Sequence, residues 1–421
     1  MEKHRHVFER FATFDNLYDG YRKASKDRRY QGCVLRYTDH LEENLINSVN
    51  QLQWHEYHVG ELHQFYEYYP KKRIISSLPF YDRVINCGAY NVLWPIYLKS
   101  MYEYSYGSID GRGPLKAAFD IQQWMRNAAR MNGDWRVVKL DIAKFFFRIP
   151  VDVQLRELTR PLDDPDMVWF LETAVRADGR PLGLPVDCTD VTTAERISGV
   201  GMQCGSIISQ MTGNVVLTPL DHYIKRTMHV PYYARFMDDM LLLVDGKKAA
   251  WEAVEEIDGY LRENLGLQLN NKTAVIPLGH AVEFVGRKIS PEKIELRRQT
   301  SLGMKKHLRY VREAYARGEV PLEYALSVIQ SYLGLMQGCN NDALRNQILE
   351  DYVLVRHSQD MLDEAEKNRL AASHAGVWLP FLYRRFRWIS LSREPSMRSS
   401  SGGSKKKTLV RTDGLLCWKK A

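Results

Sequence analysis

Two adjacent aspartates, Asp238 and Asp239, lie between a short aromatic and apolar run and an almost wholly aliphatic run in the stretch YYARFMDDMLLLV. Both runs are rich in strand-forming residues, which predicts two strands joined by a tight turn with the acidic pair at its tip. A third aspartate, Asp141, ends the buried-strand run in RVVKLDIAKFFFRI. Since like charges repel, a chain that brings these carboxylates together across neighbouring strands needs a counter-charge.

Divalent magnesium is such a counter-charge, because carboxylate oxygens can hold two of these ions about 4 Å apart. One ion lowers the pKa of an attacking hydroxyl, and the other stabilises the oxygens of a leaving phosphate. The three aspartates therefore predict nucleotidyl transfer. Asp141 alone would more often be a helix cap or a solvated turn residue, so the prediction rests on all three.

The composition limits the kind of protein. With 421 residues, 45% of them hydrophobic, the chain can bury a large core and form about two or three subdomains. No stretch of about 18 uncharged apolar residues occurs and the N-terminus lacks the apolar segment of a secretory signal, so neither membrane insertion nor export is expected. The six cysteines form no C-x-x-C pair, which indicates neither a zinc site nor a disulfide framework and favours the cytoplasm.

The hydrophobic spacing predicts the elements that would position these residues. Residues 1–70 are expected to be mainly helical, residues 71–135 to hold a basic run and two helices around a glycine-bearing turn, and residues 136–290 to alternate strands and helices. Apolar residues at three- and four-residue spacing predict helices from about Thr300 to Glu366.

The net charge of +8 is unevenly distributed. From Arg384 onward the chain is mostly basic, with aromatic residues at the start of this tail and Ser and Gly in its middle. Such a segment gains free energy on a polyanion by releasing counterions. A solvated terminus kept for solubility is the alternative, and nucleic-acid contact is favoured because of the acidic motifs upstream.

Five segments resemble, in order and at about the same spacing, the palm motifs of reverse transcriptases: the stretch from Asp141 to Phe146, then GMQCGSIISQMTGNVV, FMDD, LGLQLNNKT and EFVGRKI. Upstream, PKKRIISSLPFYDRV and SYGSIDGRGPLKAA are similar to the fingers of bacterial enzymes from group II introns, retrons and diversity-generating retroelements. The resemblance covers roughly residues 60–350. It implies an α+β right-hand polymerase with fingers, a palm in which helices pack on an antiparallel sheet, and a helical thumb.

This resemblance divides the chain into five expected segments. They are an N-terminal helical extension (1–70), fingers (71–135), a palm with a fingers insertion (136–290), a helical thumb (291–370) and a basic C-terminal segment (371–421). Residues 176–200 form a long polar insertion, for which partner contact and a plain loop are equally good interpretations.

The resemblance also assigns the metal ligands. Asp141 and Asp238 would be the principal ligands of two Mg²⁺ ions, with Asp239 close by and the backbone carbonyl of Ile142 within reach. Mn²⁺ could substitute for Mg²⁺.

Two aromatic positions carry expectations about the substrates. Phe146 lies where these enzymes place a bulky ring under the incoming sugar, and such a ring would collide with a 2′-hydroxyl and so select deoxynucleotides. Phe145 and Phe147 are expected to be core residues. Phe236 stands where most such polymerases carry Tyr, which should alter contacts to the primer end but not metal binding.

Basic residues are expected at the phosphates. Arg73, with Lys71 and Lys72 beside it, matches the fingers position that binds the triphosphate, where a guanidinium grips phosphate oxygens through paired hydrogen bonds. Lys272 matches a lysine that protonates the pyrophosphate leaving group. Simple solvation is the alternative for all of these cations. Gly286 matches the primer grip, where a glycine permits close approach of the backbone to the primer strand.

The nucleotide-pocket loop departs from the group II intron pattern of Pro-Gln-Gly, three residues and Ser-Pro. This chain has Gln203-Cys204-Gly205, three residues and Ser209-Gln210, a form similar to diversity-generating retroelement and defence-associated enzymes. Cys204, Gly205 and Gln210 would line the nucleotide site. Cys204 cannot make the hydrogen bond of the usual glutamine, and one lost polar contact of about 1 kcal/mol leads to the hypothesis of reduced fidelity.

The resulting hypothesis is an RNA-directed DNA polymerase that makes cDNA from a dedicated RNA in a diversity-generating retroelement. The alternative is an antiphage defence enzyme working with a noncoding RNA. Expected partners are template RNA, a DNA or RNA primer, deoxynucleoside triphosphates, a structured noncoding RNA and a small basic accessory protein, with no membrane. Two other classes are disfavoured: an RNA polymerase by the ring of Phe146, and a nonenzymatic RNA-binding scaffold by the intact aspartates.

Overall fold

The computed structural model describes residues 3–67, 73–186, 188, 194–203, 205–351, 353–356, 408–412 and 415–419. The chain forms two compact units. Unit 1 comprises Met1–Val285 and Ser290–Glu292, and unit 2 comprises Gly286–Ile289 and Lys293–Ala421. Helices combined with antiparallel sheets confirm the predicted α+β class.

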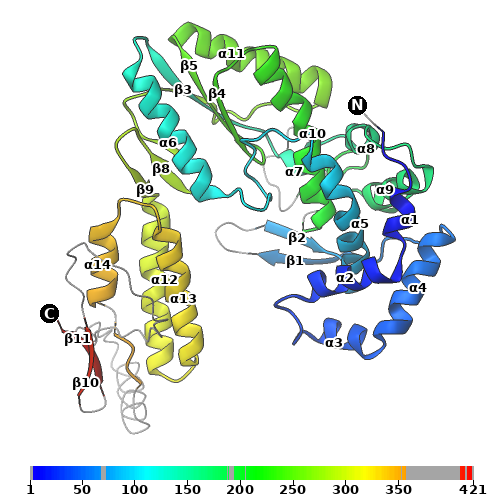
Figure 1. Ribbon diagram of the computed structural model, residues 1–421, viewed down its shortest axis with the longest axis horizontal. Helices are drawn as coiled ribbons and strands as arrows, with labels where there is room; N and C mark the ends of the chain where they lie inside the picture. Colours follow the sequence, from blue (N-terminus) through cyan, green and yellow to red (C-terminus); the bar gives the residue numbers. More distant parts are fainter. Residues whose placement is uncertain are drawn as a thin grey trace, which may run out of the picture. The chain divides into compact units, whose positions relative to one another are not determined.

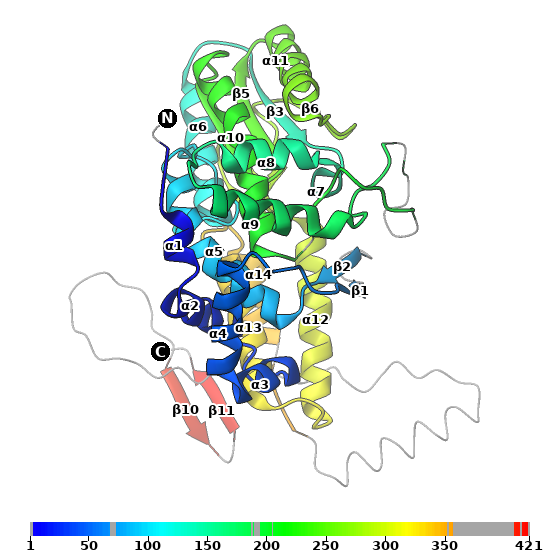
Figure 2. The same ribbon diagram turned by 90° about the vertical axis from the view of Figure 1, so that its right-hand side faces the viewer.

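The central sheet of unit 1 has the strand order β4-β5-β3-β6, and each neighbouring pair is antiparallel. Strands β3, β4 and β5 are labelled in Figure 1, and β6 in Figure 2. Val138 and Leu140 alternate along β3 onto one face, where they join a buried cluster with residues of α10 and α11. The strands and helices are β3 (Trp135–Asp141), β4 (Tyr232–Phe236), β5 (Asp239–Asp245), β6 (Ala274–Pro277), α10 (Ile207–Arg226) and α11 (Lys247–Tyr260).

The N-terminal helices pack around α5 (Phe80–Leu98). The crossing of α2 with α5 requires glycine, since a Cβ on Gly20 would lie 2.6 Å from the carbonyl oxygen of Val84. The predicted helical character of the first residues is confirmed as far as Gln53, but His63–Glu67 forms a strand, β1, that pairs with β2. The remaining bounds are α1 (Val7–Phe11), α2 (Phe14–Ser25), α3 (Gly32–Asp39), α4 (Leu41–Gln53) and β2 (Arg73–Ser77).

Asp164 links two of the helices in unit 1. One carboxylate oxygen accepts from the backbone N–H of Met167, which caps α9, and the other accepts from Val7 and Phe8 at the start of α1. Figure 2 shows α8 beside α9 and α10. The bounds are α6 (Pro114–Arg130), α7 (Phe145–Arg148), α8 (Val151–Thr159), α9 (Pro165–Arg176), η1 (Ala177–Gly179), the π-helical turn η2 (Leu261–Leu265) and β7 (Val282–Phe284).

The polar insertion at 176–200 is an irregular connection in its described part. It contains an isolated antiparallel bridge between Gly183 and Ile197, and Val200 forms another with Pro150. Residues 187 and 189–193 lie outside the described residues.

Unit 2 holds the predicted C-terminal helices. A buried cluster of Met304, Leu308, Ile329, Met336 and Ile348 packs them together. Beyond residue 356 the predicted helix and the basic tail lie outside the described residues, apart from one antiparallel hairpin. No helix among the described residues is long and apolar enough to cross a bilayer. The bounds are β8 (Arg287–Ile289), β9 (Ile294–Leu296), α12 (Arg298–Ala316), α13 (Leu322–Met336), α14 (Asp342–Asp351), β10 (Thr408–Thr412) and β11 (Leu415–Lys419).

Candidate active site

The acidic pair lies on the predicted hairpin. β4 and β5 pair in a register that sets Phe236 opposite Asp239, so the connecting turn consists of Met237 and Asp238 alone. Asp238 is therefore at the tip, while Asp239 already begins β5. Met237 has a positive φ of 56°. A positive φ at the first turn residue alone is the pattern of a type II′ turn, in which glycine is preferred at that position.

The third aspartate comes from the neighbouring strand. Asp141 ends β3 directly opposite Asp239, and side chains in that relation have Cβ atoms about 5 Å apart. Its Oδ2 accepts a 2.9 Å hydrogen bond from Nδ2 of Asn270, whose backbone N–H also donates to the Asp141 carbonyl at 2.7 Å. Asn270 was not among the predicted site residues, although it lies in the LGLQLNNKT motif. Its amide fixes the orientation of the Asp141 carboxylate through Oδ2.

The environment of Asp238 opposes its ionisation. Burial raises the pKa of this carboxyl to about 7, and the negative charges of Asp239 and Asp141 contribute to the increase, while nearby Arg235 acts weakly against it. The Asp238 carboxyl therefore ionises much less readily than an ordinary aspartate near neutral pH. A bound cation would remove this repulsion.

The donor set suits magnesium in its chemistry, since it consists of hard carboxylate oxygens and the carbonyl of Ile142. Ile142 is buried and forms an antiparallel bridge with Leu269, which places its backbone next to Asp141 in the same sheet edge. Among the described residues, no group of three or more His, Cys, Asp or Glu side chains has a geometry that could hold a metal ion. The strand register sets Asp141 opposite Asp239, and Asp238 precedes Asp239 at the turn.

The aromatic residues after Asp141 differ in their surroundings. Phe145 is 2% exposed and belongs to the core, as predicted. Phe146 is half-buried, its ring centroid lies 5.3 Å from that of Phe145 in an edge-on contact, and its carbonyl accepts from the N–H of Met202 at 2.9 Å. The prediction of a core position for Phe147 is wrong, because its ring is half-buried and the Arg196 guanidinium lies 4.7 Å from its centroid.

The nucleotide-pocket loop leads into α10. Cys204 lies outside the described residues, whereas Gly205 is exposed with a φ of 108° that side chains disfavour. Ser206 caps α10 by accepting from the N–H of Ile208 at 3.2 Å. Gln210, in the first turn, is exposed and lines a cavity of about 290 Å³ together with Phe236 of the hairpin. The loop and the hairpin thus border a common space.

The structure describes only some of the predicted phosphate-binding residues. Arg73 begins β2, but its side chain, like all of Lys71 and Lys72, lies outside the described residues. Lys272 is exposed on the turn before β6, and its backbone N–H donates to the Asn270 side chain at 3.2 Å. Gly286 has a φ of 76°, a conformation that only glycine adopts readily.

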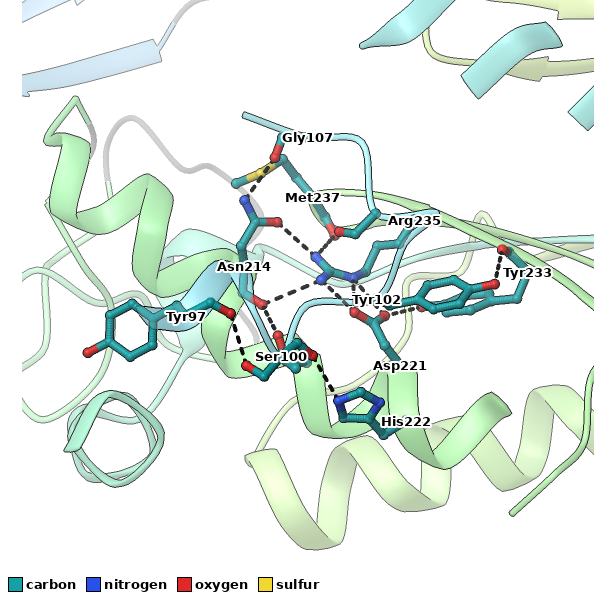
Figure 3. Close-up of polar contacts among 12 residues, drawn as sticks. Tyr97, Ser100, Tyr102, Gly107, Asn214, Asp221, His222, Tyr233, Arg235 and Met237 are labelled. Atoms are coloured by element: carbon teal, nitrogen blue, oxygen red, sulfur yellow. Dashed lines mark hydrogen bonds and ion pairs between the residues drawn. The ribbon is translucent and has the colours of Figure 1, made fainter. Parts of the chain in front are cut away.

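Behind the hairpin lies an ion pair that was not among the predicted site residues. Arg235 of β4 and Asp221 of α10 are both fully buried and meet at 2.6 Å (Figure 3). The available sequence signal was a basic residue inside the apolar strand YYARF, which must find a partner if it is buried.

A family model for reverse transcriptase (RNA-dependent DNA polymerase) matches residues 69–296, more than half of the chain. The chain belongs to the reverse transcriptase family. The matched segment contains every predicted site residue of this reverse transcriptase, from Lys71 to Gly286. The resemblance noted from the motifs is thereby confirmed at the level of the family.

Individual relatives of this reverse transcriptase are distant. Protein YkfC of Escherichia coli K12 is 22% identical over 245 residues, which cover 49% of this chain and 60% of YkfC. A telomerase structure from Candida albicans is 14% identical with a TM-score of 0.39, covering 69% of this chain and 54% of that one. A Cas6-RT-Cas1–Cas2 complex is 18% identical with a TM-score of 0.35, covering 61% of this chain and 26% of that one. The chain spans less than two thirds of each of these proteins.

Proposed function

We propose that this reverse transcriptase is an RNA-directed DNA polymerase that makes cDNA from a dedicated RNA template by two-metal nucleotidyl transfer. The observation that carries the proposal is the meeting of Asp141 with Asp239 across β3 and β5, with Asp238 at the adjoining turn. Family membership supports the reaction class. The raised pKa of Asp238 supports a cation as the missing counter-charge.

In this proposal Asp141 and Asp238 are the principal ligands of two Mg²⁺ ions, and Asp239 and the Ile142 carbonyl complete the protein's oxygen donors. Two bound Mg²⁺ ions, or Mn²⁺ in their place, would activate the primer 3′-hydroxyl and stabilise the leaving pyrophosphate. Asn270 keeps the Asp141 carboxylate oriented through its 2.9 Å hydrogen bond. Lys272 gives a proton to the pyrophosphate from its exposed Nζ.

The nucleotide site is proposed from the same set of elements. Phe146 packs under the sugar and excludes a 2′-hydroxyl, and its half-buried ring next to buried Phe145 supports this role. Arg73 and Lys72 bind the triphosphate. The loop formed by Cys204 and Gly205, with Gln210 at the start of α10, completes the pocket.

The larger regions take corresponding roles. Residues 1–70 form an N-terminal extension, 71–135 the fingers, 136–290 the palm, 291–370 the thumb and 371–421 a basic segment that binds RNA. The partners are template RNA, a DNA or RNA primer, deoxynucleoside triphosphates, a structured noncoding RNA and a small basic accessory protein.

The biological role we favour is cDNA synthesis in a diversity-generating retroelement. The departure at Cys204 and the Ser209-Gln210 ending of the pocket loop support it, because both match that group and the thiol of Cys204 weakens geometric selection of the base pair. Antiphage defence with a noncoding RNA is the second candidate, since defence-associated enzymes share the same loop form. Neighbouring genes separate the two: a template repeat and a variable repeat accompany the first, and a noncoding RNA gene in a defence island accompanies the second.

The activity itself is tested by primer extension. Purified protein is given a primer annealed to an RNA template, deoxynucleotides and Mg²⁺ or Mn²⁺, and full-length cDNA is expected. A parallel reaction with ribonucleotides should give little product. The proposal is contradicted if the primer is extended with ribonucleotides but not with deoxynucleotides, or if it is extended with neither Mg²⁺ nor Mn²⁺.

A further inference from the structure

The turn that carries Asp238 has an unfavourable backbone conformation. Met237 occupies its first position with a φ of 56°, where a Cβ crowds the backbone and glycine is the residue usually found. A residue persists in such a conformation only when its surroundings hold it there. The contacts of Met237 therefore determine where Asp238 stands.

Two glycines enclose the Met237 side chain. A Cβ on Gly107, in the loop before α6, would lie 2.6 Å from Met237 Cγ and 2.8 Å from its backbone nitrogen. A Cβ on Gly213 of α10 would lie 3.4 Å from Met237 Cε. The side chain is thus seated closely from two directions, and no larger residue fits at position 107 without moving the turn.

A single guanidinium connects these parts. Arg235 donates through Nε and Nη2 to Asp221 at 2.8 and 2.6 Å, and through Nη1 to the Asn214 side chain at 3.0 Å and the Met237 carbonyl at 3.3 Å (Figure 3). Asn214 in turn donates to the Gly107 carbonyl at 2.8 Å. Arg235 therefore joins α10, the Gly107 loop and the strained residue in one network.

We propose that Arg235, fixed by Asp221 and Asn214, is a positioning residue that holds Met237 in its positive-φ conformation and so places Asp238 for metal binding. Arg235 is fully buried, so it acts through the Met237 carbonyl rather than on substrate. The inference rests on the proposed two-metal function, because only there does the position of Asp238 matter.

The decisive variant is Arg235→Met with Asp221→Asn. It removes both charges together, which avoids an unpaired buried charge, and the introduced amide oxygen can still accept from the Tyr233 hydroxyl, as the Asp221 carboxylate does at 2.7 Å. We expect Mn²⁺ affinity and kcat to fall about tenfold, the equivalent of the backbone cost of a positive φ, while the KM for deoxynucleotides stays nearly constant. Adding Met237→Gly, which adopts a positive φ freely, should restore most of both losses.

A matched control removes a buried charge elsewhere. Glu157 of α8, whose side chain is 2% exposed, pairs with Arg156 on the same helix and with Arg160 directly after it. Glu157→Gln should leave Mn²⁺ affinity and kcat unchanged even where its thermal stability falls. Equal losses in Glu157→Gln and the Arg235 variant, or no rescue by Met237→Gly, would mean that the pair only stabilises the core.

Gly107→Ala tests the same turn without changing any charged residue. It replaces the Arg235 variant as the test if that double variant does not fold. The added methyl group pushes on Met237, so Mn²⁺ affinity should fall, with partial recovery on Met237→Gly. Hydrogen exchange of the hairpin amides supplies a readout that needs no metal: exchange should quicken in Gly107→Ala and in the Arg235 variant. Unchanged exchange in both variants overturns the positioning role. If exchange quickens in the variants but the wild-type protein neither binds Mn²⁺ nor extends a primer, the positioning role stands and the proposed function is overturned.

Discussion

Two charged clusters include residues of the β4–β5 hairpin, Arg235 and Asp238, that lie three positions apart in the chain. The charges in the two clusters are compensated in different ways. Arg235 is fully buried, and its charge is met by Asp221 in a bidentate pair at 2.6 and 2.8 Å. Asp238 is half-buried, and its burial together with the negative charges of Asp239 and Asp141 raises its pKa to about 7 despite the opposing charge of Arg235. The first cluster brings opposite charges together, and the second brings like charges together.

This difference distinguishes a charged pair that stabilises the fold from a charged group that serves a function. A buried charge normally carries its partner with it, because an unpaired one costs several kcal/mol. Where like charges are instead held close to one another, the fold gives up stability at a site that a ligand completes. Breaking the Arg235–Asp221 pair should therefore lower stability, whereas removing the acidic pair should leave stability the same or raise it, although both changes lower activity.

The largest effect is expected from Asp238→Ala combined with Asp239→Ala. Loss of charge stabilisation worth several kcal/mol should lower primer extension by about a thousandfold or more. The melting temperature should stay the same or rise, because the substitution relieves repulsion and removes no core packing. Activity is measured by primer extension and stability by thermal unfolding. Substantial extension by this variant would falsify the two-metal assignment.

The second effect concerns the sugar gate. Phe146→Val should raise ribonucleotide incorporation relative to deoxynucleotide by about tenfold, since the ring that meets the 2′-hydroxyl is gone. Competition between labelled nucleotides measures the ratio. Phe147→Val is the matched control, because this neighbouring ring is also half-buried and packs against Arg196. If both variants change discrimination equally, or neither does, the gate lies elsewhere.

The third effect is a pH dependence of metal binding. Mn²⁺ needs the ionised carboxylate, so with a pKa of about 7 at Asp238 the affinity should fall by up to about tenfold per pH unit below pH 7. Isothermal titration at pH 6, 7 and 8 measures it. A flat profile in the wild type would show that Asp238 ionises at an ordinary pKa.

The same carboxyl also predicts the sign of a stability change. The folded pKa lies above the unfolded value of about 3.9, so the folded state holds the proton more tightly between pH 4 and pH 7. Metal-free stability should therefore fall as pH rises through this window, and Asp238→Asn should reduce the slope. Asp221→Asn cannot serve as a control for Asp238→Asn, because it leaves the buried charge of Arg235 without its ion-pair partner.

The sequence was sufficient for features whose signal is local. Short apolar runs around Asp238 and Asp239 predicted the hairpin, and helical spacing predicted the bundle of α12, α13 and α14, because each pattern reflects burial of its own segment. The motifs also led to the correct family. The exact turn was less visible: Asp238 alone is at its tip, which depends on the strand register.

Features that depend on distant partners were not predictable. The strand at His63–Glu67 forms only by pairing with β2, and the Asn270–Asp141 hydrogen bond joins residues from separate motifs. Arg235 gave a signal, a cation inside an apolar strand, but nothing local identifies Asp221 as its partner. The prediction of a core position for Phe147 was wrong for the same reason, since its ring contacts Arg196 of the polar insertion.

The smallest effect is expected at Cys204, a residue outside the described part of the structure and the clearest departure from the glutamine of related enzymes. A glutamine there can hydrogen-bond the sugar of the incoming nucleotide and penalise misaligned pairs, while a thiol is a weak donor on a shorter side chain. Cys204→Gln should lower the misincorporation rate about fivefold, the equivalent of one hydrogen bond of about 1 kcal/mol. Sequencing of cDNA made from one RNA template measures the rate, and Cys33→Gln, at an exposed position on α3, is the control that should change nothing. Identical error spectra from two active enzymes would leave Cys204 with a packing role, and the fidelity argument for diversification over defence would fall with it.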